Sequence, residues 1–263
     1  MPAKESVIAA ASLCVAAALP GCSAAPSAAD PPVPTTVHST AHPTAHPAKA
    51  VFAFTVAGDR PVLPGGSQDT HAQTPNARCD SATFAADRAL GTRVARGFAL
   101  AGFPASADLL AHFLTGTGTG VNYRAGSSIA KKALASEAFR ALNAEVQTAI
   151  LRQLKAGRTR VRLSAGQLPA VAFESRSSDL YWGFRGTQGL TVTGRGTREN
   201  GRYAGTLSYV IRDSYGFPIG DTLDGFGPPM RYLQTVCGAP RYAGGAHWFP
   251  DTITVTVPFS RPA

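Results

Sequence analysis

The chain has 263 residues, a formal net charge of +9, 27 glycines, 20 prolines and only 16% charged residues. Its 44% hydrophobic content is ordinary for a globular protein, and the glycine and proline counts indicate many turns and a loop-rich or β-rich body. The positive charge favours anionic partners such as lipid headgroups, wall polymers or nucleic acid.

The first 21 residues have the pattern of a cleavable signal peptide. Lys4 supplies a basic group before the apolar run from Val7 to Leu19. That run is shorter than the roughly 20 apolar residues that a membrane-spanning helix needs, and no later segment is a better candidate. The sequence therefore predicts an exported protein whose residues 1–21 are removed.

The motif Leu19-Pro20-Gly21-Cys22 ends this segment and resembles the lipobox of bacterial lipoproteins. The resemblance implies that Cys22 is lipidated, becomes the new N-terminus and holds the protein on the extracytoplasmic face of the cell membrane. Pro20 differs from the residues usual in the motif. The alternative is an ordinary signal peptide cut near Ala25. An export signal also disfavours nucleic acid as a partner.

Residues 22–50 have the composition of a disordered tether. Ala, Pro, Ser, Thr and His dominate, without the apolar periodicity that would offset the ordering entropy. His38, His42 and His46 are spaced four apart, but the neighbouring prolines exclude the helix that would align them as metal ligands. We expect a low-complexity linker, with weak metal scavenging as the alternative.

Residues 51–263 are predicted to form a single globular α+β domain, helical over about 81–157 and β-rich over about 158–263. A β-like run covers 51–56, and helices are predicted from Ser81 to about Arg96 and over 107–114. After Ser136, apolar residues recur at intervals of three and four up to Leu154, which indicates an amphipathic helix that stops at Gly157.

Beyond Gly157 the apolar period changes to two, which indicates strands. The expected strands are 159–163, 170–173, 181–184, 190–193, 203–212 and 252–259. Gly-rich gaps such as 194–201 look like hairpin turns, and Gly227-Pro228-Pro229 predicts a short helix through Cys237. We therefore expect a helical N-terminal part packed on a mainly antiparallel C-terminal sheet.

Two cysteines remain after Cys14 leaves with the signal peptide and Cys22 is acylated. An even pair in an exported protein is most simply a disulfide, so Cys79 and Cys237 are predicted to be bonded and to tie the two halves together. A metal pair or a nucleophilic thiol is the alternative.

Three arginines, Arg158, Arg160 and Arg162, alternate as in a strand and would share one face. A solvated strand face and an anion-binding stripe both explain this pattern.

The segment from Arg212 to Gly227 contains the candidate catalytic residues Asp213, Tyr215 and Asp224 at the end of a predicted strand. Its carboxylates could act as general acid and base, although Asp also serves as a turn former. His247, beside Trp248, could face this loop and complete a cleft, or could belong to an aromatic plug over the sheet edge.

The pattern Asp213-x-Tyr215 is similar to the C-terminal domain of colicin M-type toxins, which cleave lipid-linked wall precursors. Those toxins have a second acid where Gly216 stands and a His-Arg pair a few residues later, and this chain has neither. The resemblance covers about 20 residues, and no activity is assigned from it.

Two further features have ordinary structural explanations. The run Gly116-Thr117-Gly118-Thr119-Gly120 lacks the Gly-Lys-Ser/Thr of a phosphate-binding loop, so we expect a plain loop. His112 lies in an apolar helix, where a local hydrogen bond is the simplest expectation.

The leading hypothesis is a membrane-anchored lipoprotein whose basic domain binds an anionic or protein partner in the cell envelope, without a cofactor or metal. The alternative is an envelope-directed hydrolase that uses the carboxylates of 213–224 with His247. Convergence of Asp213, Asp224 and His247 in a concavity beside Tyr215 would favour the enzyme.

Overall fold

A computed structural model describes residues 52–61, 78–185, 187–218, 225–238 and 241–263. The signal segment, the Cys22 motif, the tether and Asp224 therefore lie outside the described residues. Residues 49–263 form one compact unit. Its elements in chain order are β1 Phe52–Arg60, α2 Ser81–Leu100, α3 Pro104–Thr115, β2 Val121–Tyr123, α4 Ser128–Ala135, α5 Glu137–Lys155, β3 Arg160–Leu163, a 3-10 turn Ala165–Gln167, α6 Asp179–Phe184, β4 Gly189–Glu199, β5 Arg202–Tyr215, α7 Gly227–Thr235 and β6 Phe249–Pro262.

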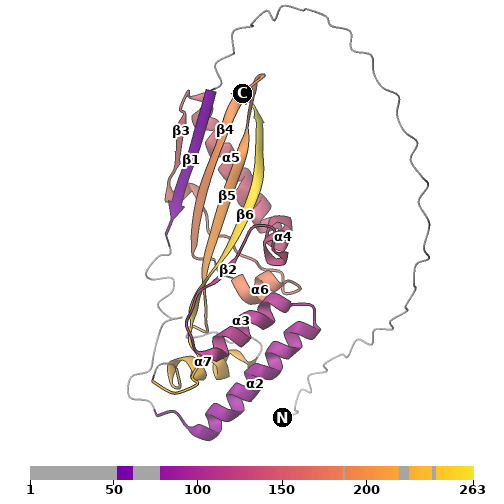
Figure 1. Ribbon diagram of the computed structural model, residues 1–263, viewed down its shortest axis with the longest axis vertical. Coiled ribbons are helices and arrows are strands. Elements are labelled where there is room, and N and C mark those ends of the chain that lie inside the picture. Colours follow the sequence, from indigo (N-terminus) through magenta and orange to yellow (C-terminus); the bar gives the residue numbers. More distant parts are fainter. Residues whose placement is uncertain (1–51, 62–77, 186, 219–224, 239–240) are drawn as a thin grey trace, which may run out of the picture. The chain divides into compact units, whose positions relative to one another are not determined.

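The described strands form one six-stranded mixed sheet of order β2-β6-β5-β4-β1-β3 (Figure 1). The pairs β1–β4, β4–β5 and β5–β6 are antiparallel, whereas β1–β3 and β2–β6 are parallel. The predicted α+β class is confirmed, with the sheet mostly in the C-terminal half of the chain. The N-terminal β1 also joins it, between β4 and β3.

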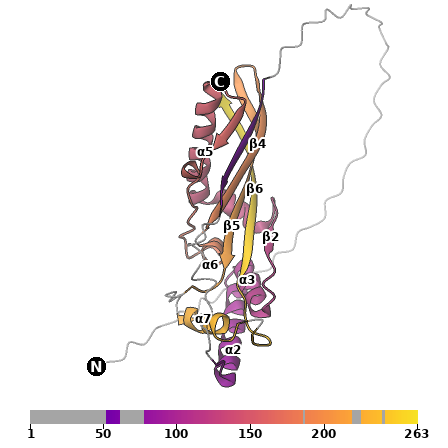
Figure 2. The ribbon, with the colours of Figure 1, turned by 90° about the vertical axis from the view of Figure 1, so that its left-hand side faces the viewer.

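Helix α5 covers one face of the sheet (Figure 2). Ser136 caps its first turn by accepting from the Phe139 N–H, and its apolar stripe is buried against the core. Tyr209 of β5 packs edge-to-face on Phe139 and donates its hydroxyl hydrogen to the Asn143 side chain. Tyr203, further along β5, donates to the Leu154 carbonyl. These contacts fix the helix along the strand direction.

Helices α2, α3 and α7 group beyond one end of the sheet in both side views (Figures 1 and 2). The predicted disulfide between Cys79 and Cys237 is present. It joins the segment that leads into α2 to the segment that follows α7, and the Tyr232 hydroxyl accepts from the Asp80 N–H beside it. The bridge therefore ties together two helices that come from different halves of the chain.

Several predicted strands and turns differ from the structure. Residues 181–184 belong to α6, because Leu180, Tyr181 and Phe184 bury a helical rather than an alternating face. Residues 170–173 make only an isolated bridge at Ala172. Residues 194–199 continue β4 instead of turning, and the turn is confined to Asn200 and Gly201, both at positive φ.

Close packing against neighbouring strands explains the glycines of β4, which the sequence analysis had interpreted as a turn. A side chain at Gly196 would meet the Phe54 ring at 2.5 Å, and one at Gly194 would meet Leu207 at 2.6 Å. Both glycines leave room for large core residues of the neighbouring strands. The short elements α4 and β2 were also not predicted.

Candidate functional site

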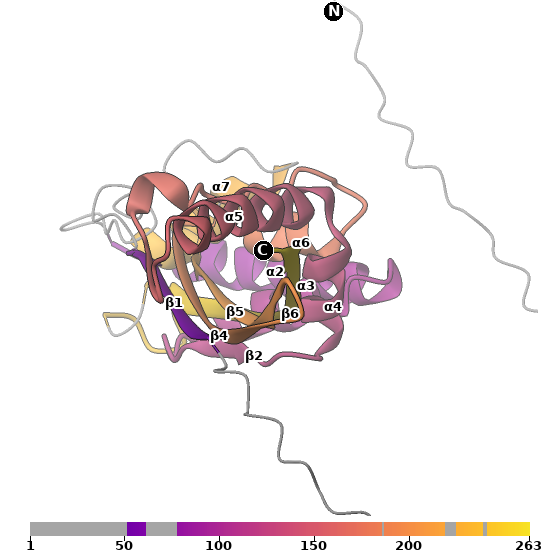
Figure 3. The ribbon, with the colours of Figure 1, turned by 90° about the horizontal axis from the view of Figure 1, so that it is seen from above.

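One face of the sheet stays in contact with solvent, and it is the face opposite α5 (Figure 3). Thr55 of β1 lies between Arg160 of β3 and Arg195 of β4, and Arg195 lies opposite Thr206 of β5. All four are exposed. Because alternate strand residues point to opposite faces, the registers define this surface, which we call the open face. It consists of the odd-numbered residues of β1 and β4 and the even-numbered residues of the other strands.

The open face is basic. Its charged residues are five arginines and two acids: Arg160, Arg162, Arg195, Arg202, Arg212, Asp59 and Glu199. Arg160 and Arg162 confirm that part of the predicted arginine stripe lies in a strand, with both side chains exposed. Arg158 precedes the strand, where its N–H donates to the Gln153 carbonyl.

Three of these arginines are free to bind a ligand. Among the described residues, the guanidinium groups of Arg160, Arg162 and Arg195 make no ion pair or hydrogen bond. Arg160 and Arg162 are two residues apart on β3, so their Cα atoms are about 7 Å apart. Arg160 and Arg195 are two strands apart, or about 10 Å. The three positive charges therefore form a compact triangle at the β3 side of the sheet.

Arg212 has a different role on the same face. Its guanidinium donates to the Asp59 carboxylate at 2.7 Å and to the Arg60 carbonyl. The Thr191 hydroxyl also donates to Asp59. The hydrogen bonds from Arg212 and then Thr191 lower the pKa of Asp59. Arg212 thus neutralises Asp59 on β1, and the other acid of the open face, Glu199, lies at the opposite end of β4, across from Arg202.

The rest of the open face is hydroxylic and small. Its side chains include no aromatic ring, because the aromatic residues of the described strands all point to the other face. Thr and Ser are frequent instead, and one row of hydroxyls, Thr193, Ser208 and Thr256, crosses β4, β5 and β6. The hydroxyl positions are Thr55, Thr191, Thr193, Thr197, Thr206, Ser208, Ser214, Thr252, Thr254, Thr256 and Ser260.

Asp213 lies on the other, buried face. The predicted loop is here still strand, since β5 continues to Tyr215. Asp213 pairs directly with Asp251 of β6, and the two side chains are 8% and 1% exposed. Burial raises the pKa of Asp213 to about 8. Burial, and then the nearby Asp213, raise the pKa of Asp251 well above its usual range. Asp251 was not among the predicted site residues.

The pair has few compensating contacts. Among the described residues, neither carboxylate oxygen of Asp251 has a hydrogen-bond partner, and the one hydrogen bond to Asp213 comes from the adjacent Ser214 N–H. Tyr123 is nearby, and its pKa is raised by burial and then by Asp108, Asp251 and Asp179. Opposed residues of an antiparallel pair have Cβ atoms about 5 Å apart, close enough for two carboxyl groups to share a proton.

Tyr215 and His247 take part in packing. The Tyr215 ring is buried and stacks on Phe249 at 5.3 Å. The His247 ring packs on the backbone of Gly118, where an added Cβ would lie 2.8 Å from Nδ1, and Nδ1 contacts the Trp248 carbonyl. In the part of the chain that the structure describes, His247 makes no contact with Asp213. The candidate residues are therefore not brought together in one site here.

His112 is satisfied locally, as expected. Its Nε2 atom lies 2.8 Å from the Thr119 carbonyl, and its ring meets Phe249 edge-on. The glycine-rich segment 116–120 is a loop that follows α3, with Gly116 ending the helix at a φ of 71°.

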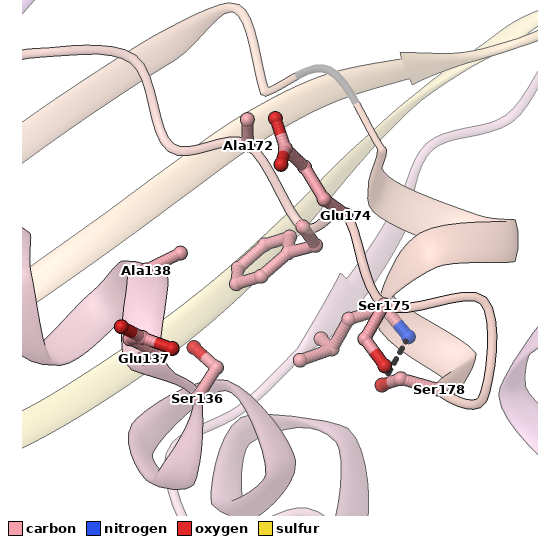
Figure 4. A pocket seen from close by; sticks show the side chains of 9 residues that line it. Ser136, Glu137, Ala138, Ala172, Glu174, Ser175 and Ser178 are labelled. Atoms are coloured by element: carbon pink, nitrogen blue, oxygen red, sulfur yellow. Dashed lines mark hydrogen bonds between the residues drawn. The ribbon is translucent and has the colours of Figure 1, made fainter.

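A cavity of about 410 Å³ lies elsewhere, between the start of α5 and the segment before α6 (Figure 4). Glu137 and Glu174 stand at its rim, and Phe173 and Leu180 form a buried floor. Neither Asp213 nor Asp251 lines it. No three His, Cys, Asp or Glu side chains of the described residues could hold a metal ion.

No model of a known protein family matches this chain, and no curated protein or solved structure is similar to it. None of the described helices is long and apolar enough to cross a membrane. The function is therefore inferred from the chain's own residues.

Proposed function

We propose that this chain is an exported lipoprotein, held on the extracytoplasmic face of the cell membrane by a lipid on Cys22, whose basic domain binds an anionic partner in the cell envelope. The observation that carries the binding proposal is the open face, with exposed and unpaired guanidinium groups at Arg160, Arg162 and Arg195.

The physical reason is that unpaired guanidinium groups on a rigid sheet are prepared to bind anions. Each presents several N–H donors in a fixed fork that matches a carboxylate or phosphate. The sheet fixes their spacing, so little ordering is needed when an anion arrives. The net charge of +9 adds a long-range attraction that raises the rate of encounter with a polyanion.

An envelope-directed hydrolase remains the alternative proposal. Its candidate catalytic carboxyl groups are Asp213 and the newly found Asp251. Raised carboxyl pKa values gather at catalytic sites, which favours this reading. Both carboxyl groups are nevertheless buried, and the 410 Å³ cavity does not reach them. Binding through the open face has the stronger support.

The test compares two variants of equal charge. The first removes the proposed site by Arg160→Gln, Arg162→Gln and Arg195→Gln. The control replaces three exposed helix arginines, by Arg96→Gln, Arg140→Gln and Arg152→Gln. Binding of the full-length chain, with Cys22→Ala in every variant so that no lipid contributes, to isolated wall and membrane fractions is measured at low and moderate salt. We expect the first variant to bind at least about tenfold more weakly, because charge-assisted contacts are lost.

Two outcomes would contradict the proposal. Binding that does not change with salt would exclude an electrostatic contact, since exposed charges are screened over about 10 Å at 0.1 M salt. An equal loss in the helix variant would show that net charge, and not the open face, is responsible.

A further inference from the structure

We infer that the ligand of the open face is a linear phosphodiester polymer of small polyol units, such as poly(glycerol phosphate), which lies across β3, β1, β4 and β5. This inference rests on the proposed function and narrows it to one class of anion. It follows from three properties of the open face, namely its charge spacing, its hydroxyls and its lack of rings.

The charge spacing favours a polymer over a single small anion. Arg160 and Arg195 occupy one row across the sheet, with Thr55 between them, and Arg162 lies in the next row. Their separations of about 7 and 10 Å are too large for one phosphate to engage all three at full strength. A chain with one charge per unit can engage them in turn, and the linked contacts then reinforce one another.

The hydroxyls favour a ligand that carries its own polar groups between its charges. Thr193 of β4 and Thr206 of β5 are exposed, flank Arg195 along and across the strands, and make no side-chain hydrogen bond within the described residues. A hydroxyl can donate to a phosphate oxygen or accept from a polyol hydroxyl. A row of such groups suits a polyol phosphate.

The lack of aromatic side chains argues against single-stranded nucleic acid and against insertion into a bilayer. Proteins that bind single-stranded nucleic acids stack bases on aromatic rings, and the open face has no ring to offer. Insertion into a bilayer needs exposed Trp, Phe or Leu, and the described strands place none of these on the open face, whose larger apolar residues are Val210 and the prolines of β6. A membrane surface is thus the less favoured source of phosphate, although its headgroups share the charge.

The position of the unpaired arginines indicates which strands the polymer crosses. Arg212 of β5 is paired with Asp59 of β1, so among the described residues the unpaired guanidinium groups of the open face lie on β3 and β4, at Arg160, Arg162 and Arg195. The polymer is therefore expected to bind across β3, β1, β4 and β5, and to leave the β6 side unoccupied.

The experiment uses the full-length chain with Cys22→Ala, so that a lipid does not add its own membrane affinity. Binding to fluorescent poly(glycerol phosphate), to polyglutamate of equal charge and to phosphatidylglycerol vesicles is compared at one salt concentration. We expect poly(glycerol phosphate) to bind at least about tenfold more tightly than the other two. Equal or tighter binding of polyglutamate or of the vesicles would overturn the inference while leaving the anion-binding proposal intact.

A second variant tests the hydroxyls without changing charge. Thr193→Val and Thr206→Val together keep the side-chain shape and the β preference, so the sheet is expected to remain folded. They should weaken poly(glycerol phosphate) binding several-fold and leave polyglutamate binding unchanged. No change for either polymer would refute recognition of the polyol. Failure of all three anions to bind would instead refute the proposed function itself.

Discussion

Asp213 and Asp251 occupy positions where the strand pattern calls for apolar side chains. Ile211 and Ile253 form the preceding rung of the β5–β6 pair, and Tyr215 and Phe249 form the following one. An ionised carboxylate there would lack the hydrogen bonds that a buried charge requires. Sharing of one proton, or protonation of both groups, removes most of that cost. The charge state of this rung should therefore affect stability.

The first prediction is that stability falls as pH rises. Both carboxyl groups have a folded-state pKa above that of an unfolded Asp, with Asp213 at about 8. The folded state then holds more protons than the unfolded state, so this contribution is fully present below about pH 4 and is lost as pH rises through about 8. Melting temperatures measured from about pH 5 to 9 should decrease, and Asp251→Asn should flatten the decrease and be more stable than the parent at about pH 9.

The matched control is Glu145→Gln, which makes the same chemical change at an exposed position of α5. It should leave the pH dependence of melting as in the parent chain. If Asp251→Asn and the parent lose stability in parallel as pH rises, the buried pair is not the cause. That result would also remove the reason for placing a shared proton on Asp213 and Asp251.

The sequence indicated Asp213 but not its partner. Asp213 stood out because acids, aromatics and glycines cluster after a predicted strand. Asp251 lies 38 positions later, just past the His247 segment, and becomes relevant only through the β5–β6 register. A register between strands separated by a helix depends on tertiary packing, which one sequence does not show. The arginine alternation at 160 and 162, in contrast, is a local pattern and was predicted.

At the scale of elements, long periodic segments were predictable and short apolar ones were not. The spacing from Phe139 to Leu154 defined α5, and its Ser136 cap and Gly157 stop were both found. The run at 181–184 is apolar throughout, so periodicity could not separate a strand from a helical turn. The glycines at 194 and 196 were interpreted as a turn because the packing that requires them, Gly194 against Leu207 and Gly196 against Phe54, exists only in the folded sheet.

The second prediction concerns the disulfide between α2 and α7. It closes a span of 158 residues, which on the chain-entropy model contributes about 4 to 5 kcal/mol. Cys79→Ser with Cys237→Ser should therefore lower the free energy of unfolding by an amount of that order, measured by denaturant titration. Reduction of the parent chain should have the same effect, and identical midpoints before and after reduction would show that the bond is not formed.

At the scale of the whole molecule, the sheet order explains why the open face is basic. The edge strand β3 comes from the middle of the chain and pairs in parallel with the N-terminal β1, which also pairs with β4. This arrangement brings Arg160 and Arg162 beside Arg195. In the sequence Arg195 is far from Arg160 and Arg162, and nothing local indicates that β1 lies between β3 and β4.

The third prediction concerns the anchor, which lies outside the described residues. If Cys22 is lipidated, mass spectrometry of the mature N-terminus should find an acylated Cys22, and Cys22→Ala should release the protein from membranes into the medium. The open face would then keep its affinity for polyanions, because Arg160 and its neighbours belong to the compact unit that begins at residue 49. Release together with preserved polymer binding would separate where the protein is held from what it binds. An unmodified N-terminus downstream of Cys22 would refute the anchor and leave the binding proposal to its own test.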